Sequence, residues 1–145
     1  NQSGEFTYPD AKTLAKLRYW VVQNKLLAGA YPGQPDPASI SHLRFPIPDG
    51  GVTSVDRMRS ILDAIDLSHE ANRGVYVHCF GGMGRTGTTI CCWLLRHRSV
   101  DRSNVLSVLT RLRQADKERA DWKAPENVDQ ESFVLNWSDD AATPQ

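Results

Sequence analysis

Two short runs of strand-forming residues near the start of the chain predict two β-strands. Residues 19–22 are rich in aromatic and β-branched side chains, and residues 26–30 are small or apolar. The polar residues 23–25 separate the two runs. Glycine and proline at Pro32 and Gly33 then break the second strand.

A third strand is predicted where apolar residues alternate at Leu43, Phe45 and Ile47. Pro46 lies inside this run, and proline has no N–H to donate to a neighbouring strand. We therefore expect a strand over residues 42–47 at an edge of the sheet.

A later apolar run bounded by glycine, residues 74–79, predicts a buried strand. Elsewhere, apolar residues that recur every three or four positions predict four helices. We expect the helices over residues 53–72, where Thr53 and Asp56 have the spacing of a capping box; over 88–98; from a cap at Asp101 or Ser103 to about residue 112; and over 127–137.

Strands that alternate with helices are typical of an α/β fold with helices over a central, mostly parallel sheet. At 145 residues the chain is long enough for one domain with a sizeable core, so we expect a single domain over residues 1–145.

Charge and composition exclude several classes of protein. Lys plus Arg and Asp plus Glu both number 17, so no net field favours nucleic acid or an anionic membrane. With 40% hydrophobic and 23% charged residues, the chain is neither disordered nor a coiled coil. No apolar run approaches the ~18 residues of a membrane helix. Residues 1–8 lack a signal-peptide pattern, so we expect any leader to have been removed already. We also expect the protein to be cytoplasmic and monomeric.

The candidate chemistry lies in residues 78–87, His-Cys-Phe-Gly-Gly-Met-Gly-Arg-Thr-Gly. Cys79 ends a predicted strand, and a glycine-rich turn leads from it into a helix. Backbone N–H groups and the positive helix end converge at such a turn, which favours a thiolate and binds an oxyanion. Arg85 adds a planar fork that suits two phosphate oxygens. The pattern predicts a loop that binds a tetrahedral dianion and aims a nucleophile at it.

The other two cysteines have a different setting. Cys92 and Arg98 repeat the spacing of Cys79 and Arg85, but inside an apolar helix without glycine. We interpret Cys91 and Cys92 as core residues, with a weaker alternative in which one of them is a redox partner of Cys79. Three cysteines form neither a paired disulfide framework nor a Cys-x-x-Cys metal clip, which favours a reducing compartment.

These motifs resemble the cysteine-dependent protein tyrosine phosphatases. The resemblance to compact bacterial dual-specificity phosphatases is closer, because residues 27–33, 45–51, 78–87 and 130–137 follow in the same order. It implies a phosphomonoester hydrolase that acts through a phosphocysteine intermediate, without a metal or other cofactor. It also implies a phosphorylated protein or peptide as the substrate.

The resemblance assigns roles to individual residues. Cys79 would be the nucleophile, Arg85 would hold phosphoryl oxygens, Asp49 would act as general acid and then base, Thr86 would donate to the cysteine sulfur, and Gln130 would position water. The phosphate would be bound by the loop residues His78, Phe80, Gly81, Gly82, Met83, Gly84 and Arg85.

Each assignment has an ordinary structural alternative. Cys79 could be a small buried side chain, Asp49 a solvated turn residue, Thr86 a helix cap, His78 a core residue and Gln130 a polar position on the last helix. Asp56 is the nearest rival acid, although its place in a first helical turn suits capping better.

The resemblance also implies a helix and a further strand between Ser39 and Ile40, beside the strand that carries Cys79. Only about ten loop-like residues separate Tyr31 from His42, which is too short for the crossover between parallel neighbours. We therefore expect residues to be missing near 38–40.

Substrate class rests on the variable loop positions Phe80, Gly82 and Met83, which carry no charge. An apolar rim favours a phosphorylated aromatic side chain over a polyphosphate. Two alternatives stay open: a small-molecule or phosphoinositide phosphatase with the same loop, and a catalytically silent phosphate-binding module.

Overall fold

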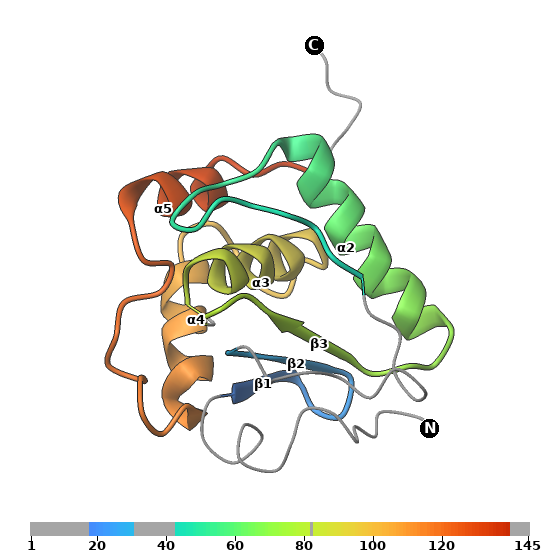
Figure 1. The fold of residues 1–145 in the computed structure, drawn as a ribbon, viewed down its shortest axis with the longest axis horizontal. Helices are drawn as coiled ribbons and strands as arrows, with labels where there is room; N and C mark the ends of the chain where they lie inside the picture. Colours follow the sequence, from blue (N-terminus) through green and yellow to red (C-terminus); the bar gives the residue numbers. More distant parts are fainter. Residues whose placement is uncertain (1–17, 31–42, 82, 140–145) are drawn as a thin grey trace.

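The computed structural model describes residues 18–30, 43–81 and 83–139. It is an α/β fold, as expected, in which strands alternate with helices (Figure 1). The elements are β1 (Arg18–Val22), β2 (Leu26–Gly29), α2 (Val55–Glu70), β3 (Val75–His78), α3 (Gly84–Arg96), α4 (Val105–Leu112), a short 3₁₀ helix (Arg113–Ala115) and α5 (Val128–Leu135).

The three strands form a mixed sheet in the order β1-β2-β3. β1 and β2 are antiparallel because a tight turn joins them, in which the Lys25 N–H donates to the Val22 carbonyl at 2.9 Å. β2 and β3 are parallel, from Leu26 opposite Val75 to Gly29 opposite His78, and the long connection between them contains α2. The expectation of a mostly parallel sheet is therefore corrected to a mixed one.

The strand expected over residues 42–47 is wrong for the part that the structure describes. Residues 43–48 have no regular secondary structure. Pro46 has no N–H for a ladder, and the Ile47 carbonyl accepts a hydrogen bond from the Arg85 side chain. Phe45 and Ile47 still pack against the core, which explains their apolar character. Residues 38–40, where we expected a missing segment, lie outside the described part, and that expectation stays a prediction.

Two helices have N-caps other than those we expected. Ser54, and not Thr53, caps α2, because its hydroxyl accepts from the Arg57 N–H at 3.0 Å. α4 begins after Asn104, and not after Asp101 or Ser103. The Asn104 side chain accepts from the Asp101 N–H at 2.9 Å. At α5 the expected start is confirmed, since Asn127 is its N-cap.

Helix α3 begins four residues earlier than the apolar pattern predicted, at Gly84 in place of Thr88. Close packing favours glycine in its first turns. A Cβ on Gly87 would lie 3.3 Å from a Leu109 methyl. The earlier start puts Arg85 and Thr86 in the first turn of the helix.

Helix α3 is the centre of the core. It contacts α2, α4 and α5, and it also lies against β2 and β3 (Figure 1). Its buried residues include Ile90, Cys91, Cys92 and Leu94. No helix in the described ranges combines the length and the apolar character needed to cross a bilayer. The candidate active site described below lies at the first turn of α3, most of whose residues are buried.

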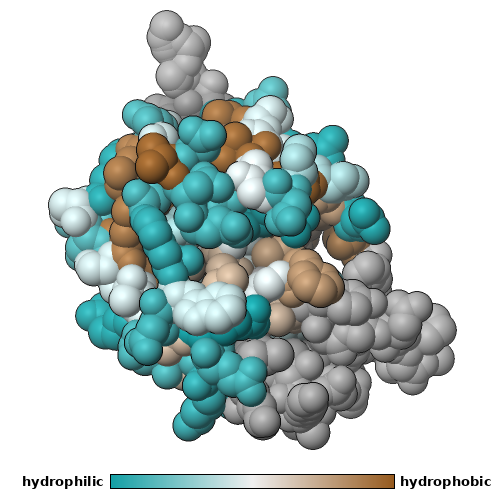
Figure 2. Space-filling model, turned by 60° about the vertical axis from the view of Figure 1, so that its left-hand side comes forward, coloured by the Kyte–Doolittle hydropathy of each residue, from teal (hydrophilic) through white to brown (hydrophobic). Residues whose placement is uncertain are grey.

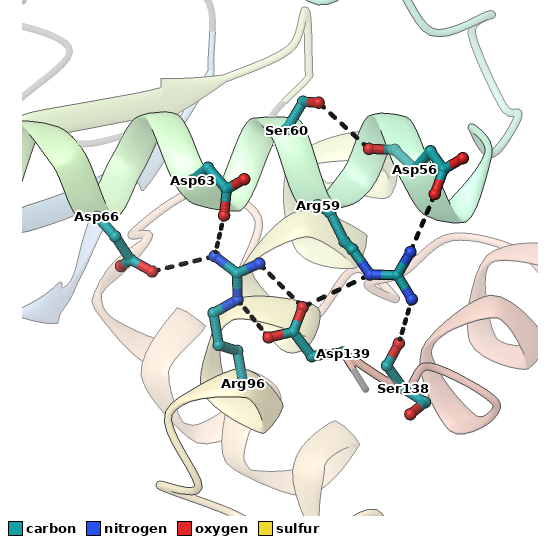
Figure 3. Close-up of polar contacts among 8 residues, drawn as sticks. All are labelled: Asp56, Arg59, Ser60, Asp63, Asp66, Arg96, Ser138 and Asp139. Carbon is teal, nitrogen blue, oxygen red and sulfur yellow. Dashed lines mark hydrogen bonds and ion pairs between the residues drawn. The ribbon is translucent and has the colours of Figure 1, made fainter. Parts of the chain in front are cut away.

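A cluster of charged side chains connects α2, α3 and the segment after α5 (Figure 3). Arg96 of α3 lies at its centre and bonds Asp63 at 2.9 Å, Asp66 at 3.1 Å and both oxygens of Asp139 at 2.8 and 2.9 Å. Burial acts to lower the pKa of Arg96, but hydrogen bonds to the three carboxylates outweigh burial and raise the pKa. The guanidinium therefore stays charged while it joins three segments of the chain.

Candidate active site

The candidate nucleophile lies in the connection between β3 and α3. Cys79 directly follows the last residue of β3, is half-buried and is not part of a disulfide. Phe80 beside it is 79% exposed. Gly81 and Met83 are half-buried and Gly84 is buried, whereas Gly82 lies outside the described residues. A strand, a short glycine-rich turn and a helix thus occur in the predicted order around Cys79.

Arg85 connects this turn to a second loop. Its Nη1 donates to the Ile47 carbonyl at 3.1 Å, and its Nη2 lies 3.3 Å from Oδ1 of Asp49. The Asp49 side chain is 88% exposed, whereas that of Arg85 is 22% exposed. The structure therefore brings the candidate acid to the candidate phosphate-binding guanidinium.

Asp49 lies in a tight turn over residues 48–51. The Gly51 N–H donates to the Pro48 carbonyl at 2.8 Å, and Gly50 has a φ of 77°, a conformation that glycine adopts readily. We refer to residues 48–51 as the aspartate turn. Its geometry favours glycine at position 50 and presents the Asp49 side chain to solvent.

Helix α5 contacts the aspartate turn through two side-chain amides. Asn127 Nδ2 donates to the Gly50 carbonyl at 2.8 Å, and Gln130 Nε2 donates to the Gly51 carbonyl at 3.2 Å. Gln130 is fully buried, and its Oε1 accepts from the Glu126 N–H at 2.9 Å. Both ends of the Gln130 amide are therefore bonded to backbone, and a role in positioning water would require one of these bonds to open.

Thr86 is buried, and its hydroxyl has no hydrogen-bond partner among the described residues. A buried hydroxyl without an acceptor is costly, so each such group requires an explanation. An ordinary N-cap does not provide one, because Met83 occupies the N-cap position of α3. The predicted donation from Thr86 to the Cys79 sulfur is therefore not formed in this structure, and the role of Thr86 stays a prediction.

His78 is half-buried at the end of β3, with its ring centroid 5.5 Å from that of Tyr76. The Tyr76 hydroxyl donates to the Ala30 carbonyl at 2.6 Å and so connects β3 to the end of β2. The histidine therefore lies beside an aromatic ring that is itself anchored by a hydrogen bond.

Asp56, the rival acid, has a different partner. Its carboxylate accepts from Arg59 of the same helix at 2.9 Å and is 93% exposed. It lies in the first turn of α2, where a negative charge is favourable. Among the described residues, Asp49 is thus the aspartate that pairs with Arg85.

Cys91 and Cys92 are both buried in α3, as expected for core residues. Burial raises the pKa of the Cys91 thiol to about 12, and burial also raises the pKa of Cys92. Both side chains are therefore neutral thiols at physiological pH and poor nucleophiles.

Arg119 is a residue near the site that sequence reasoning missed. Its Nη1 would lie 3.7 Å from a Cβ on Gly81. The turn that carries it is anchored by buried Arg113, which donates to the Arg119 carbonyl at 2.8 Å and to the Trp122 carbonyl at 2.6 Å. No local pattern marks Arg119, because only the packing of this turn brings it to the loop.

Comparison with known proteins decides the family. The family model described as "Polymorphic toxin system, DSP-PTPase phosphatase" matches residues 11–99, more than half of the chain. The chain belongs to this family. It is accordingly a domain of the dual-specificity protein phosphatase type.

Individual relatives of this DSP-PTPase domain match over shorter stretches. It is 36% identical to pig (Sus scrofa) cyclin-dependent kinase inhibitor 3 over 39% of this chain and 26% of that protein. It is also 36% identical to the tyrosine-protein phosphatase cdc-14 of Caenorhabditis elegans, over 41% of this chain and 8% of that one. The alignments thus cover only about a quarter or less of these relatives.

Solved structures share the fold of the DSP-PTPase domain. The active form of Tk-PTP superposes with a TM-score of 0.61 at 20% identity, over 81% of this chain and 92% of that one. A kinase-associated phosphatase with its catalytic cysteine replaced by serine gives a TM-score of 0.51 at 22% identity, over 61% of this chain and 47% of that one. At these identities the likeness supports the fold.

Proposed function

We propose that this DSP-PTPase domain hydrolyses phosphomonoesters through a phosphocysteine intermediate, with phosphotyrosine in proteins as the substrate class. The observation that carries the proposal is the 3.3 Å contact between Asp49 and Arg85. Arg85 lies in the first turn of α3, the helix that follows the Cys79 loop. This contact supports a site in which a nucleophile, a phosphate-binding guanidinium and an acid face one bound group.

In the first step, the Cys79 sulfur attacks phosphorus, an S–P bond forms and the P–O bond to the leaving group breaks. Asp49 gives its proton to the leaving oxygen, since a phenolate or alkoxide is otherwise a poor leaving group. Arg85 and the loop N–H groups hold the equatorial oxygens while their charge redistributes. Phosphoryl oxygens would then take the guanidinium donors that now face Asp49 and Ile47.

In the second step, water attacks phosphorus and gives a proton to the Asp49 carboxylate. The S–P bond breaks, and its electron pair returns to Cys79 as a thiolate. Thr86 would support this step by turning its buried hydroxyl, which has no partner among the described residues, toward the sulfur as the negative charge returns. The products are inorganic phosphate and an enzyme ready for another cycle.

The rim of the loop supports an aromatic phosphoresidue. Phe80 is exposed and offers a ring face for stacking against a phenyl ring. The described loop residues carry one positive side chain, that of Arg85. Figure 2 shows apolar groups scattered among hydrophilic ones on the face it displays.

The test is hydrolysis of an aryl phosphate and a phosphotyrosine peptide in the presence of EDTA. We expect turnover by the wild type and none by Cys79→Ser, with phosphate release from the tyrosine peptide faster than from a phosphothreonine peptide or an inositol phosphate. Loss of turnover in EDTA, or activity in Cys79→Ser, would overturn the cysteine mechanism. Tight phosphate binding without turnover would identify a silent binding module.

A further inference from the structure

Two side-chain amides at the start of α5, one on its N-cap Asn127 and one on Gln130 in its first turn, point at the aspartate turn. Asn127 donates to the Gly50 carbonyl and Gln130 to the Gly51 carbonyl, at 2.8 and 3.2 Å. These contacts join residues 77 and 79 positions apart in the chain. The turn is therefore fixed to α5 immediately after Asp49.

The orientation of both amides is determined by their second contact. Asn127 Oδ1 accepts from the Gln130 N–H at 2.9 Å, and Gln130 Oε1 accepts from the Glu126 N–H at 2.9 Å. Only the oxygen of an amide can accept these bonds, so the NH₂ group of each side chain must face the carbonyl of the turn. Each amide thus caps or braces α5 with one end and holds the turn with the other.

Among the described residues, few other hydrogen bonds hold the aspartate turn in place. The Asp49 side chain is exposed, so packing does not orient it. Arg85 also holds the turn, through the carboxylate of Asp49 and the carbonyl of Ile47 just before the turn. In the reaction proposed above, phosphoryl oxygens occupy that guanidinium, and the contacts of Arg85 with the turn weaken at the moment when Asp49 must act.

Gln130 also lies against the start of α3. A Cβ on Gly84 would lie 2.8 Å from Gln130 Nε2, and it would overlap the Glu126 carboxylate as well. The buried Gln130 side chain is therefore confined between the first residue of α3 and the aspartate turn. Gln130 thus connects the start of α3 to the turn that carries Asp49, and does not itself contact the substrate.

We propose that Asn127 and Gln130 are positioning residues that keep Asp49 in place for proton transfer once phosphate occupies Arg85. This inference rests on the proposed function, because it takes Asp49 as the general acid. The two amides hold the backbone of the turn, while the carboxyl group stays free to reach the leaving oxygen. If the acid is misplaced, the rate of the first step falls even when the nucleophile and the phosphate-binding loop are intact.

Two nearly isosteric variants test the proposal, Asn127→Asp and Gln130→Glu. Each keeps the oxygen that accepts a backbone N–H, that of Gln130 or of Glu126, and replaces the donor NH₂ with a second oxygen. The local contact survives, and the ionised carboxylate can no longer donate to the turn. Asn104→Asp is the matched control. It makes the same change of charge at the N-cap of α4, where the side-chain oxygen accepts from the Asp101 N–H.

The readout is kcat/KM for a series of aryl phosphates, from dinitrophenyl phosphate, whose leaving group needs little protonation, to phenyl phosphate, whose leaving group has a pKa of about 10. In both α5 variants we expect a loss of about tenfold or more for phenyl phosphate and less than about twofold for dinitrophenyl phosphate. Asn104→Asp should show neither change, and thermal unfolding should show that all three variants fold.

Equal losses across the series, or none, would overturn the positioning role. Asp49→Asn distinguishes this failure from failure of the proposed function. If Asp49→Asn steepens the dependence on the leaving group and the α5 variants do not, only the positioning role is wrong. If Asp49→Asn does not steepen it, the assignment of the acid is wrong.

Discussion

Nη2 of Arg85 lies 3.3 Å from Oδ1 of Asp49, although 36 positions separate the two residues in the chain. One side chain belongs to the helix after the candidate nucleophile, and the other to a solvent-exposed turn. Substrate phosphate and Asp49 would thus share one guanidinium, and this relationship leads to the first two predictions.

Replacement of Asp49 by Asn removes the proton donor and preserves the size of the side chain. General acid catalysis contributes about 10²–10⁴-fold, so we expect kcat/KM for a phosphotyrosine peptide to fall by about 10²-fold or more. Substrates with good leaving groups should lose much less. Steady-state kinetics over the two substrate types measures this, and a uniform loss would contradict the role.

Replacement of Arg85 by Lys keeps the charge but loses the planar pair of donors. Loss of one preorganised donor costs about 10²–10³-fold in rate, so we expect a drop of that size in kcat/KM with every leaving group. Vanadate should also bind more weakly, which can be measured by inhibition of the wild type and by calorimetry of both proteins. Unchanged vanadate affinity would show that Arg85 does not hold the phosphoryl oxygens.

The three cysteines should differ in reactivity. Cys79 is half-buried at the surface turn, whereas burial raises the pKa of Cys91 to about 12 and raises that of Cys92. Iodoacetamide at neutral pH should therefore label one thiol in the native protein and all three after denaturation. Mass spectrometry identifies the labelled residue, and Cys79→Ser should abolish the native reaction. Labelling of Cys91 or Cys92 before unfolding would contradict the burial.

Arg113 should be important for stability. It is 1% exposed and donates to the carbonyls of Arg119 and Trp122. Arg113→Met leaves both carbonyls without these donors, so we expect the free energy of unfolding to fall by about 2 kcal/mol. Urea denaturation measures the change. The control is Arg111→Met two residues earlier, where the side chain is exposed and the loss should be within about 0.5 kcal/mol.

We expect the contribution of Asp66 to the free energy of unfolding to be lost in acid. Burial raises its pKa, but hydrogen bonds from Trp93, His97 and Arg96 outweigh burial and hold the pKa below its usual value of 3.8. A carboxyl group with a lower pKa in the folded state stabilises the protein above its unfolded-state pKa. That contribution is lost as the pH falls through the folded-state pKa.

The stability difference between the wild type and Asp66→Asn should therefore shrink as the pH falls from about 5 to about 3. Chemical denaturation at a series of pH values measures it. The control is Asp121→Asn, at an exposed aspartate outside this cluster, which should show no comparable trend. A difference that grows in acid would contradict the direction of the pKa.

Local order along the chain could be predicted from residue patterns. The hairpin strands, the strand before Cys79 and the helices follow from periodicity and from glycines and caps, because these features depend on neighbours a few residues away. The glycine-rich turn between β3 and α3 was likewise visible from composition and spacing, and with it the candidate pair of Cys79 and Arg85.

Contacts between distant segments were decided by the packed chain. Alternating apolar residues predicted a strand over 42–47, but the Ile47 carbonyl bonds to Arg85 in place of a neighbouring strand. The resemblance implied that Gln130 positions water, but its buried amide is hydrogen-bonded to the Gly51 carbonyl and the Glu126 N–H. A period in the sequence reports which side of an element is buried. It carries no information about which backbone carbonyl, 38 or 79 residues away, a side chain will contact, since that depends on how the helices pack on the sheet.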